Sequence, residues 1–369
     1  LGPSLELVEA LTELGHAETL QGRSEDGVQV AERALMLAKE LGLPRPARAL
    51  GLRGMARANL GDPGGLQDYR EAIVLATVAG QGREVGWLHN TLGCNLWAFE
   101  GPAAALEVLR DGIAFARARG LTERVDITTQ SALDALVDIG GHDEVLEVAA
   151  DMAERLEASG NVVDLAGVRA NQARIVALRG QGGQMAVLEW LESAARGSED
   201  PHLVVCGLGS SALARAVLGQ DEATAALLTE IEEYPRARET GYYAPLLPAM
   251  VRTALGIGEP ALAERLLAGL EPRYPYAEHA LVAANAALTE ARRDLQAAAD
   301  AYADAADRWE RFGVVPEQAF ALLGQGRCLL GLSRPTEAAP ILQQAREIFE
   351  RLQAAPALAE TDALLASAA

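Results

Sequence analysis

The stretch "LGDPGG", Leu60 to Gly65, decides the fold because versions of it recur along the whole chain. A glycine here ends one segment of helical periodicity, and an aspartate and a proline begin the next, which is the usual order of a helix stop and a helix start. Comparable breaks carrying glycine occur at Gly22, Gly101, Gly141, Gly180, Gly219, Gly258 and Gly331. Recurrence of this kind indicates an internal repeat.

The spacing of these breaks defines the length of the repeat. From Gly22 to Gly258 successive breaks lie 39 or 40 residues apart, and the interval of 73 residues to Gly331 spans two periods with a missing break near Asp294. Secondary breaks, such as "LGLPRP" at 41–46, divide the intervals into two helical segments. Units of two helices bury their apolar faces only by stacking. We therefore predict an all-α, right-handed α-solenoid of about nine helical hairpins, with one domain over 1–369 and a capping helix over 355–369.

The composition supports helices and excludes several kinds of site. Hydrophobic residues make up 50% of the chain, with Ala and Leu dominant, whereas aromatic residues make up 4%, a bias that favours helices. The formal net charge of −20 disfavours nucleic acid as a partner, because phosphate binding needs a basic stripe. Lys39 is the only lysine, and its neighbours match neither a phosphate-binding loop nor a nucleophilic lysine motif.

Cysteine usage and hydropathy predict a cytoplasmic protein. Cys94, Cys206 and Cys328 lie more than 100 residues apart, which predicts neither a disulfide framework nor a zinc site and favours a reducing compartment. No apolar stretch reaches the roughly 18 residues of a membrane-spanning helix, so no membrane partner is expected. Residue 1 is Leu and not Met, which predicts that the chain is a piece of a longer polypeptide.

Four repeats contain a Leu-Gly or Gly motif followed by a turn glycine. The matching sets are Leu14, Gly15 and Gly22; Leu323, Gly324 and Gly331; Leu92, Gly93 and Gly101, one residue longer; and Gly54 with Gly61. In these residues the chain resembles the tetratricopeptide repeat (TPR) family, whose repeat is shorter, about 34 residues. Glycine is needed there because the two helices of a hairpin approach closely. The resemblance implies stacked hairpins that bind a protein or peptide and catalyse nothing.

Three longer stretches are similar to a narrower group of arrays. They are "LGDPGGLQDYREAIVLATVAG" at 60–80, "FEGPAAALEVLRDGIAFARARGL" at 99–121 and "EAAPILQQAREIFERLQAAPALAETDALL" at 337–365. They resemble the carboxy-terminal TPR region of bacterial regulators in which an adenylate/guanylate cyclase domain precedes an AAA-type ATPase. That resemblance implies a regulatory module whose partners include the upstream domains of its own parent chain. The alternative is a small-ligand or inducer sensor, because similar arrays end LuxR- and MalT-like transcriptional activators.

The segment "WLHNTLGCNLWAFEG", from Trp87 to Gly101, contains the residues that most resemble a chemical site. On a helix, His89 and Cys94 project about 140° apart. They therefore form no nucleophile–base pair and share no face for a metal ion. His89 borders the apolar stripe formed by Leu88, Leu92 and Leu96. We predict no catalytic residue, no metal site and no cofactor in the chain.

A second face of the same helix is the predicted binding surface. Its members follow one another at intervals of three, four and three residues: Trp87, Asn90, Cys94 and Trp97. The resemblance to TPR proteins implies that this face of a first helix lines a concave groove. Two tryptophans beside an asparagine would supply apolar anchors and one polar contact. The alternative is that both tryptophans pack against the second helix of a neighbouring repeat.

Weaker candidates lie in the later repeats. Tyr242 and Tyr243 belong to "YYAPLLP" at 242–248, where the prolines predict a late start or kink that opens a pocket, or simply an irregular repeat. The segment 271–280, "EPRYPYAEHA", is expected to be a long loop that forms an interaction spot. A small-ligand site would need arginines on the inner face, for which Arg169, Arg215 and Arg327 are the candidates. Exposed end repeats also allow a homodimer.

Overall fold

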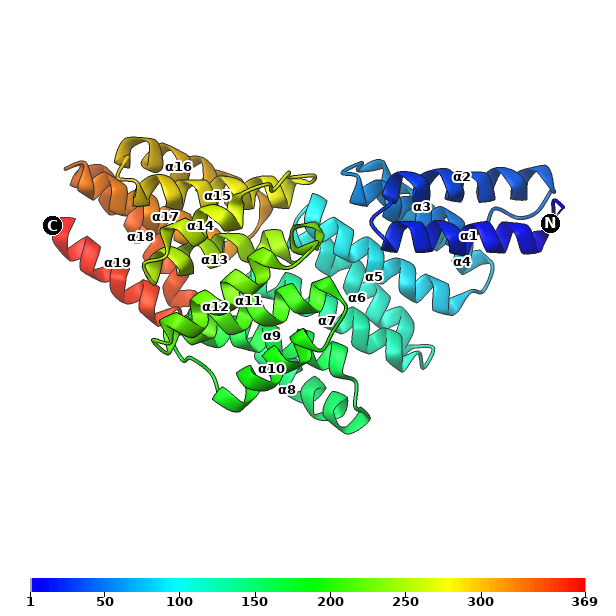
Figure 1. Cartoon of the computed structure of the whole chain (residues 1–369), viewed down its shortest axis with the longest axis horizontal. Helices are drawn as coiled ribbons and strands as arrows, with labels where there is room; N and C mark the ends of the chain where they lie inside the picture. Colours follow the sequence, from blue (N-terminus) through cyan, green and yellow to red (C-terminus); the bar gives the residue numbers. More distant parts are fainter. Residues whose placement is uncertain (1, 369) are drawn as a thin grey trace. The chain divides into compact units, whose positions relative to one another are not determined.

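The computed structural model describes residues 2–368, and within them every regular element is a helix (Figure 1). These residues form nineteen α-helices and one short 3-10 helix. The chain divides into two compact units, of which the first ends at Ala132 and the second begins at Leu133. The all-α class is confirmed, whereas the expectation of a single domain over residues 1–369 stays a prediction.

The first unit contains three helical hairpins and the first part of a fourth. Their helices are α1 (Leu5–Leu20), α2 (Ser24–Glu40), α3 (Ala47–Asn59), α4 (Gly64–Val78), α5 (Gly82–Phe99) and α6 (Pro102–Arg117). Helix α7 (Thr122–Asp138) begins in this unit and ends in the second. The two helices of a hairpin are called here its first and second helix.

The second unit contains the rest of the fourth hairpin, five further hairpins and a last single helix. Their helices are α8 (His142–Ser159), α9 (Val162–Leu178), α10 (Met185–Arg196), α11 (Pro201–Val217), α12 (Asp221–Glu233), η1 (Ala237–Glu239), α13 (Tyr243–Gly256), α14 (Pro260–Leu267), α15 (Pro275–Ala291), α16 (Leu295–Phe312), α17 (Val315–Gly331), α18 (Pro335–Leu352) and α19 (Ala355–Ala368). In the described residues the prediction of a solenoid of nine hairpins with a capping helix is therefore confirmed.

The breaks between the two helices of a hairpin have the backbone geometry that their glycines predict. Gly61 and Gly101 have φ values of 83° and 98°, in the left-handed region that favours glycine. The break that lacks a glycine, between α15 and α16, uses the same geometry with another residue. Arg293 adopts a φ of 68°, and Asp294 then caps α16 by accepting a hydrogen bond from the Ala297 amide at 3.3 Å. The missing break is thus a missing glycine and not a missing turn.

Small residues allow the helices of a hairpin to pack closely. In the hairpin α3–α4, a Cβ atom placed on Gly65 would lie 2.4 Å from the carbonyl oxygen of Gly54. Neither residue has a side chain, so the two helix backbones are in direct contact. Larger groups fill the core elsewhere, and Tyr69, Tyr276 and Trp309 are all fully buried.

Two irregular segments in the second unit take the structures that their prolines allow. Helix α13 begins late, at Tyr243, and retains Pro248 inside it, as expected. The expectation of a loop over residues 271–280 is wrong, because Pro275 begins α15 and Tyr276 is already in the core. Proline suits the first turn of a helix, where its missing N–H would have no partner. Among the described residues, no helix is both long and apolar enough to cross a membrane.

Candidate functional site

The four residues predicted for a groove on α5 differ in exposure. Trp97 is buried, Cys94 is exposed, and Trp87 and Asn90 are half-buried. The Trp87 ring lies against Gly51 of α3, and the Arg48 guanidinium is 5.6 Å from its centroid. Trp87 thus contacts the first helix of the preceding hairpin. A role for this face in binding stays a prediction.

His89 and Cys94 have separate surroundings, as their angular separation on the helix predicts. The Nδ1 atom of His89 is 2.8 Å from the carbonyl oxygen of Val85, and its ring stacks on Phe115 with centroids 6.1 Å apart. Among the described residues, no group of three or more His, Cys, Asp and Glu side chains could hold a metal ion.

The weaker candidates occupy different places in the second unit. The Tyr242 hydroxyl donates to the Asp134 carboxylate at 2.8 Å. Tyr243 is buried, its hydroxyl donates to the carbonyl oxygen of Leu266 at 2.6 Å, and burial raises its pKa to about 12. Arg169 pairs with Glu157, and its guanidinium lies 4.2 Å from the Trp190 ring centroid.

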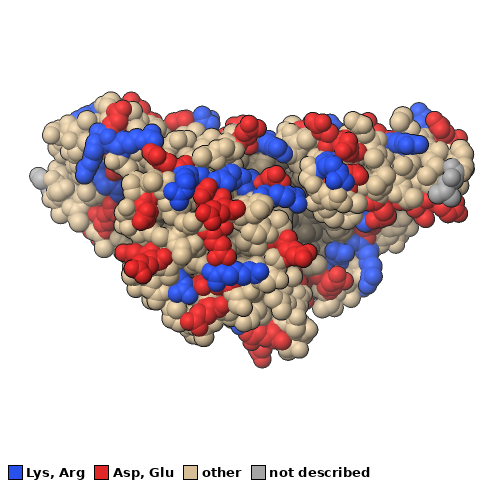
Figure 2. Space-filling view, viewed as in Figure 1, with Lys and Arg blue, Asp and Glu red and all other residues tan. Residues whose placement is uncertain are grey.

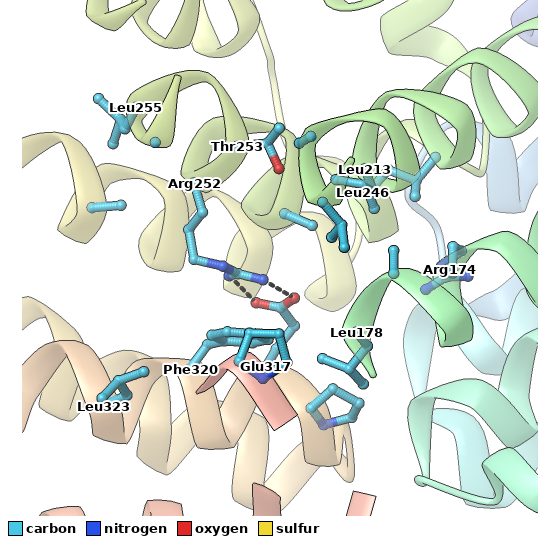
Figure 3. Close-up of a pocket in the computed structure, with 18 of the residues that line it drawn as sticks. Arg174, Leu178, Leu213, Leu246, Arg252, Thr253, Leu255, Glu317, Phe320 and Leu323 are labelled. Atoms are coloured by element: carbon cyan, nitrogen blue, oxygen red, sulfur yellow. Dashed lines mark hydrogen bonds and ion pairs between the residues drawn. The ribbon is translucent and has the colours of Figure 1, made fainter. Parts of the chain in front are cut away.

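A cavity of about 880 Å³ in the second unit is the candidate site. Most of its lining comes from α7, α9, α11, α13, α15, α17 and α19, which are the first helices of the hairpins together with the capping helix. Figure 3 shows that the labelled side chains of α9, α11, α13 and α17 converge on one space. Of the three arginines predicted to reach the inner face, Arg327 lines this cavity, whereas Arg215 pairs with Glu192 at 2.6 Å.

The lining residues recur at the period of the sequence repeat. Arg174, Leu213, Arg252 and Ala291 follow one another at intervals of 39 residues, and all four line the cavity. One stripe of each first helix therefore faces the same space. The prediction named Arg169 on α9, which is five residues from Arg174 and about 140° around the helix from it. Following the 39-residue register through the first helices would have found Arg174 and Arg252.

An ion pair between Arg252 and Glu317 lies at the centre of the labelled residues in Figure 3. The two terminal nitrogens of Arg252, on α13, donate to the two carboxylate oxygens of Glu317, on α17, at 2.6 and 2.8 Å. The guanidinium also lies 4.0 Å from the Phe320 ring centroid. This bidentate geometry orients both charged groups, and Glu317 is only 8% exposed.

A second polar cluster joins α7, α9 and α15. Arg174 lies 3.6 Å from the Asp138 carboxylate, which also accepts a hydrogen bond from the Tyr276 hydroxyl at 3.0 Å. Burial, together with the negative charge of Asp138, raises the pKa of Tyr276 well above its usual value. The phenol therefore keeps its proton at neutral pH and remains a donor to Asp138.

A third cluster surrounds Arg327 on α17. Its guanidinium donates to Glu290 at 2.5 and 2.9 Å and to Glu360 of α19 at 2.5 Å. The Tyr302 hydroxyl donates to the same Glu290 carboxylate at 2.8 Å. Burial alone would lower the pKa of Arg327, but the hydrogen bond and charge of Glu290 raise it above its ordinary value. Arg327 is therefore a permanent cation held between two carboxylates.

Apolar side chains separate these charged groups. Those labelled in Figure 3 are Leu178, Leu213, Leu246, Leu255, Phe320 and Leu323. A wall of this composition can bind an apolar group and orient it by a few polar contacts. The lining contains no cysteine, serine or lysine, so it offers none of those nucleophiles.

The ion pair between Arg252 and Glu317 supports a direct prediction. In Arg252→Met the buried Glu317 carboxylate loses its partner, so we expect the free energy of unfolding to fall by about 2 kcal/mol. The double variant Arg252→Met/Glu317→Met removes both charges and should recover at least about half of that loss. Urea denaturation of the wild type and both variants measures this coupling. A double variant less stable than Arg252→Met would contradict it.

The buried side chain of His142, at the start of α8, should make the free energy of unfolding depend on pH. Burial, aided by the charges of Arg179 and Arg174, lowers its pKa from 6.5 to about 4. Because the unfolded chain binds the proton more readily, stability should be full above pH 6.5 and fall as the pH is lowered toward 4. The expected loss from this residue is about 2 to 3 kcal/mol. His142→Leu cannot take up the proton, so urea denaturation at pH 7 and pH 4.5 should show a smaller loss. Equal losses in the two proteins would refute this assignment.

Comparisons with known proteins add little to this geometry. No family model and no curated protein matches the chain. Among solved structures, a circular tandem repeat protein with a novel repeat topology is 16% identical, and the match covers 98% of this chain and 93% of that one. The TPR domain of P58(IPK) is 14% identical, over 98% of each chain. Yeast Tom70 is 10% identical, over 98% of this chain and 96% of its own. Each of the three has a TM-score of 0.27, so the fold assignment rests on the helices described above.

Proposed function

We propose that this chain is a non-catalytic interaction module that binds a protein segment or peptide in the cavity of its second unit. The observation that carries this proposal is the cavity lined by the first helices, which brings Arg174, Arg252 and Arg327 together with apolar side chains around one space. A peptide needs both kinds of contact, because its side chains are buried against apolar walls while its amide groups need polar partners.

The role within a larger protein follows from the resemblance of residues 60–80, 99–121 and 337–365. We infer that the module is the TPR portion of a bacterial signalling regulator of the cyclase–ATPase type. Its ligand would then be a segment of the upstream domains of the same parent chain, or of a protein that regulates them. Binding of this segment in the cavity would depend on the state of those domains. It would be coupled to them through the hairpins that line the cavity.

A second function is favoured by the size of the cavity. About 880 Å³ falls within the range of about 300 to 1,000 Å³ that is usual for small-molecule sites. A small ligand or inducer, as in activators of the LuxR and MalT type, could therefore fill it. The two functions differ in what the cavity must admit, since a peptide extends through an opening and a small molecule is enclosed.

Blocking the cavity tests the proposed function. Ala249 lines it from α13 and is half-buried, so Ala249→Trp should fill part of the space without disturbing a packed core. Val78→Trp, at an exposed position of α4, is the matched control. A displayed library of random dodecapeptides is selected on the wild type and on both variants.

We expect the same peptide families to be enriched on the wild type and on Val78→Trp and to be lost on Ala249→Trp. Families retained on all three proteins would show that binding lies elsewhere and would refute the proposal. A thermal-shift screen of small molecules on the same proteins separates the two functions. Ligands that stabilise the wild type but not Ala249→Trp, without any peptide family, would favour the second function.

A further inference from the structure

We propose that the ligand of this cavity is a peptide segment carrying basic and leucine-like side chains, and that acidic or phosphorylated segments are excluded. The proposal rests on the proposed function and deepens it by naming the chemistry of the ligand. It is carried by how the charged groups of the lining are already paired.

The three inner arginines are not free to bind an anion. Both terminal nitrogens of Arg252 donate hydrogen bonds to Glu317. The Arg327 guanidinium donates hydrogen bonds to both Glu290 and Glu360. Arg174 lies beside Asp138. An incoming carboxylate or phosphate would have to displace a carboxylate that is held bidentately or half-buried, and the displaced group would remain nearby as a like charge. These three arginines therefore hold the carboxylates of the lining in place and do not offer a binding site for an anion.

The acids of the lining keep unused capacity for cations. Asp221, at the exposed start of α12, has no ion pair in the described part of the chain. Glu360 is paired through one oxygen, Oε1, and its side chain is 45% exposed. A lysine or arginine of the ligand could reach either carboxylate without breaking a buried pair. A fourth lining arginine, Arg293, has no carboxylate partner among the described residues, but it is exposed in the turn before α16, where solvent screens its charge.

The charge of the whole chain acts in the same direction. The formal net charge of −20 creates a negative field that attracts cationic segments and repels anionic ones. Figure 2 shows acidic side chains spread over the whole face in view, with basic side chains among them. Apolar walls strengthen the effect inside the cavity, because the local dielectric constant is lower there than in water.

The apolar part of the ligand follows from the side chains between the charged clusters. Leu213 on α11 and Leu246 and Leu255 on α13 line one part of the cavity, and Phe320 and Leu323 of α17 line another (Figure 3). These positions suit branched aliphatic or aromatic side chains of a peptide. Alternation of such residues with Lys or Arg would match the alternation of apolar and charged groups in the lining.

Pools of defined charge test this inference. Acetylated and amidated hexapeptides are prepared in four pools, each containing Leu, Phe and Ala. The first adds Lys and Arg, the second Asp and Glu, the third Gln, and the fourth phosphoserine. The immobilised 369-residue chain is equilibrated with each pool, and the retained peptides are identified by mass spectrometry. Ala249→Trp serves as the blocked control.

We expect retention of peptides from the basic pool alone, loss of that retention on Ala249→Trp, and weaker retention at high salt. The double variant Asp221→Asn/Glu360→Gln changes two exposed carboxylates and should fold normally. This double variant should bind the retained basic peptides with about tenfold lower affinity than the wild type.

Each other outcome is decisive. Retention from the acidic or phosphoserine pool, lost on Ala249→Trp, would overturn this inference and leave the proposed function standing. If Asp221→Asn/Glu360→Gln retains basic peptides as well as the wild type does, these two acids do not bind the basic side chains of the ligand. That result would overturn the inference. No specific retention from any pool would overturn both the inference and the peptide-binding function.

Discussion

Replacing Gly65 by valine is expected to lower the free energy of unfolding of the first unit by at least about 3 kcal/mol. A Cβ atom on Gly65 would lie 2.4 Å from the carbonyl oxygen of Gly54 and 3.1 Å from the amide nitrogen of Ala58. Both neighbours belong to the backbone of α3, so no side chain can rotate away. Helices α3 and α4 would have to separate, and the apolar contacts between them would be lost with the close approach.

Chemical denaturation followed by circular dichroism measures this effect. Gly82→Val is the matched control, because a Cβ atom there would meet only the Cδ atom of Arg119, at an ordinary 3.7 Å. We expect the control to change stability by less than about 1 kcal/mol. Equal stabilities of the two variants would contradict the close packing of α3 on α4.

Replacing Trp309 by alanine should produce the largest loss in the second unit, about 4 kcal/mol. Trp309 is fully buried on α16, and its ring lies edge-on to Tyr276 and His279 of α15, with centroids 5.3 and 5.6 Å away. Phe312, one turn further along α16, joins the same cluster. Removing the Trp309 ring leaves a cavity. The neighbouring aromatic rings cannot fill this cavity without losing their own contacts.

Trp309→Phe separates ring packing from the polar group of the side chain. The indole Nε1 of Trp309 has no hydrogen-bond partner among the described residues, so losing its N–H should cost little. We expect Trp309→Phe to lose about 1 to 2 kcal/mol, well below the loss in Trp309→Ala. Similar losses in both variants, measured by urea denaturation, would show that packing does not govern this site.

The helical repeat was predictable from the sequence because its signals are local. At most breaks a glycine adopts a left-handed conformation that other residues rarely take, so these breaks are visible as residue types. The same reasoning failed at Arg293, where another residue adopts that conformation. It also failed at Pro275, where proline begins a helix and does not prolong a loop. In both places the residue type permits two local structures, so the sequence pattern alone does not decide between them.

The cavity was harder to predict because it depends on register over long distances. Arg174 and Arg252 are two periods apart in the sequence, and only the stacking of the first helices brings them to one space. Their carboxylate partners come from other hairpins, and no local motif marks them. On α5, the helical period showed which residues share a face. It did not show that Trp97 is buried while Cys94 is exposed, because the contacts of a first helix depend on its neighbours.

The most direct test of the central claim is calorimetric titration of one selected peptide into the wild-type chain and into Ala249→Trp. If the cavity of the second unit is the binding site, the wild type will bind one peptide saturably. Ala249→Trp will release no binding heat, although its circular dichroism spectrum is unchanged. Binding of the same peptide with equal affinity to both proteins would place the site elsewhere and contradict the claim.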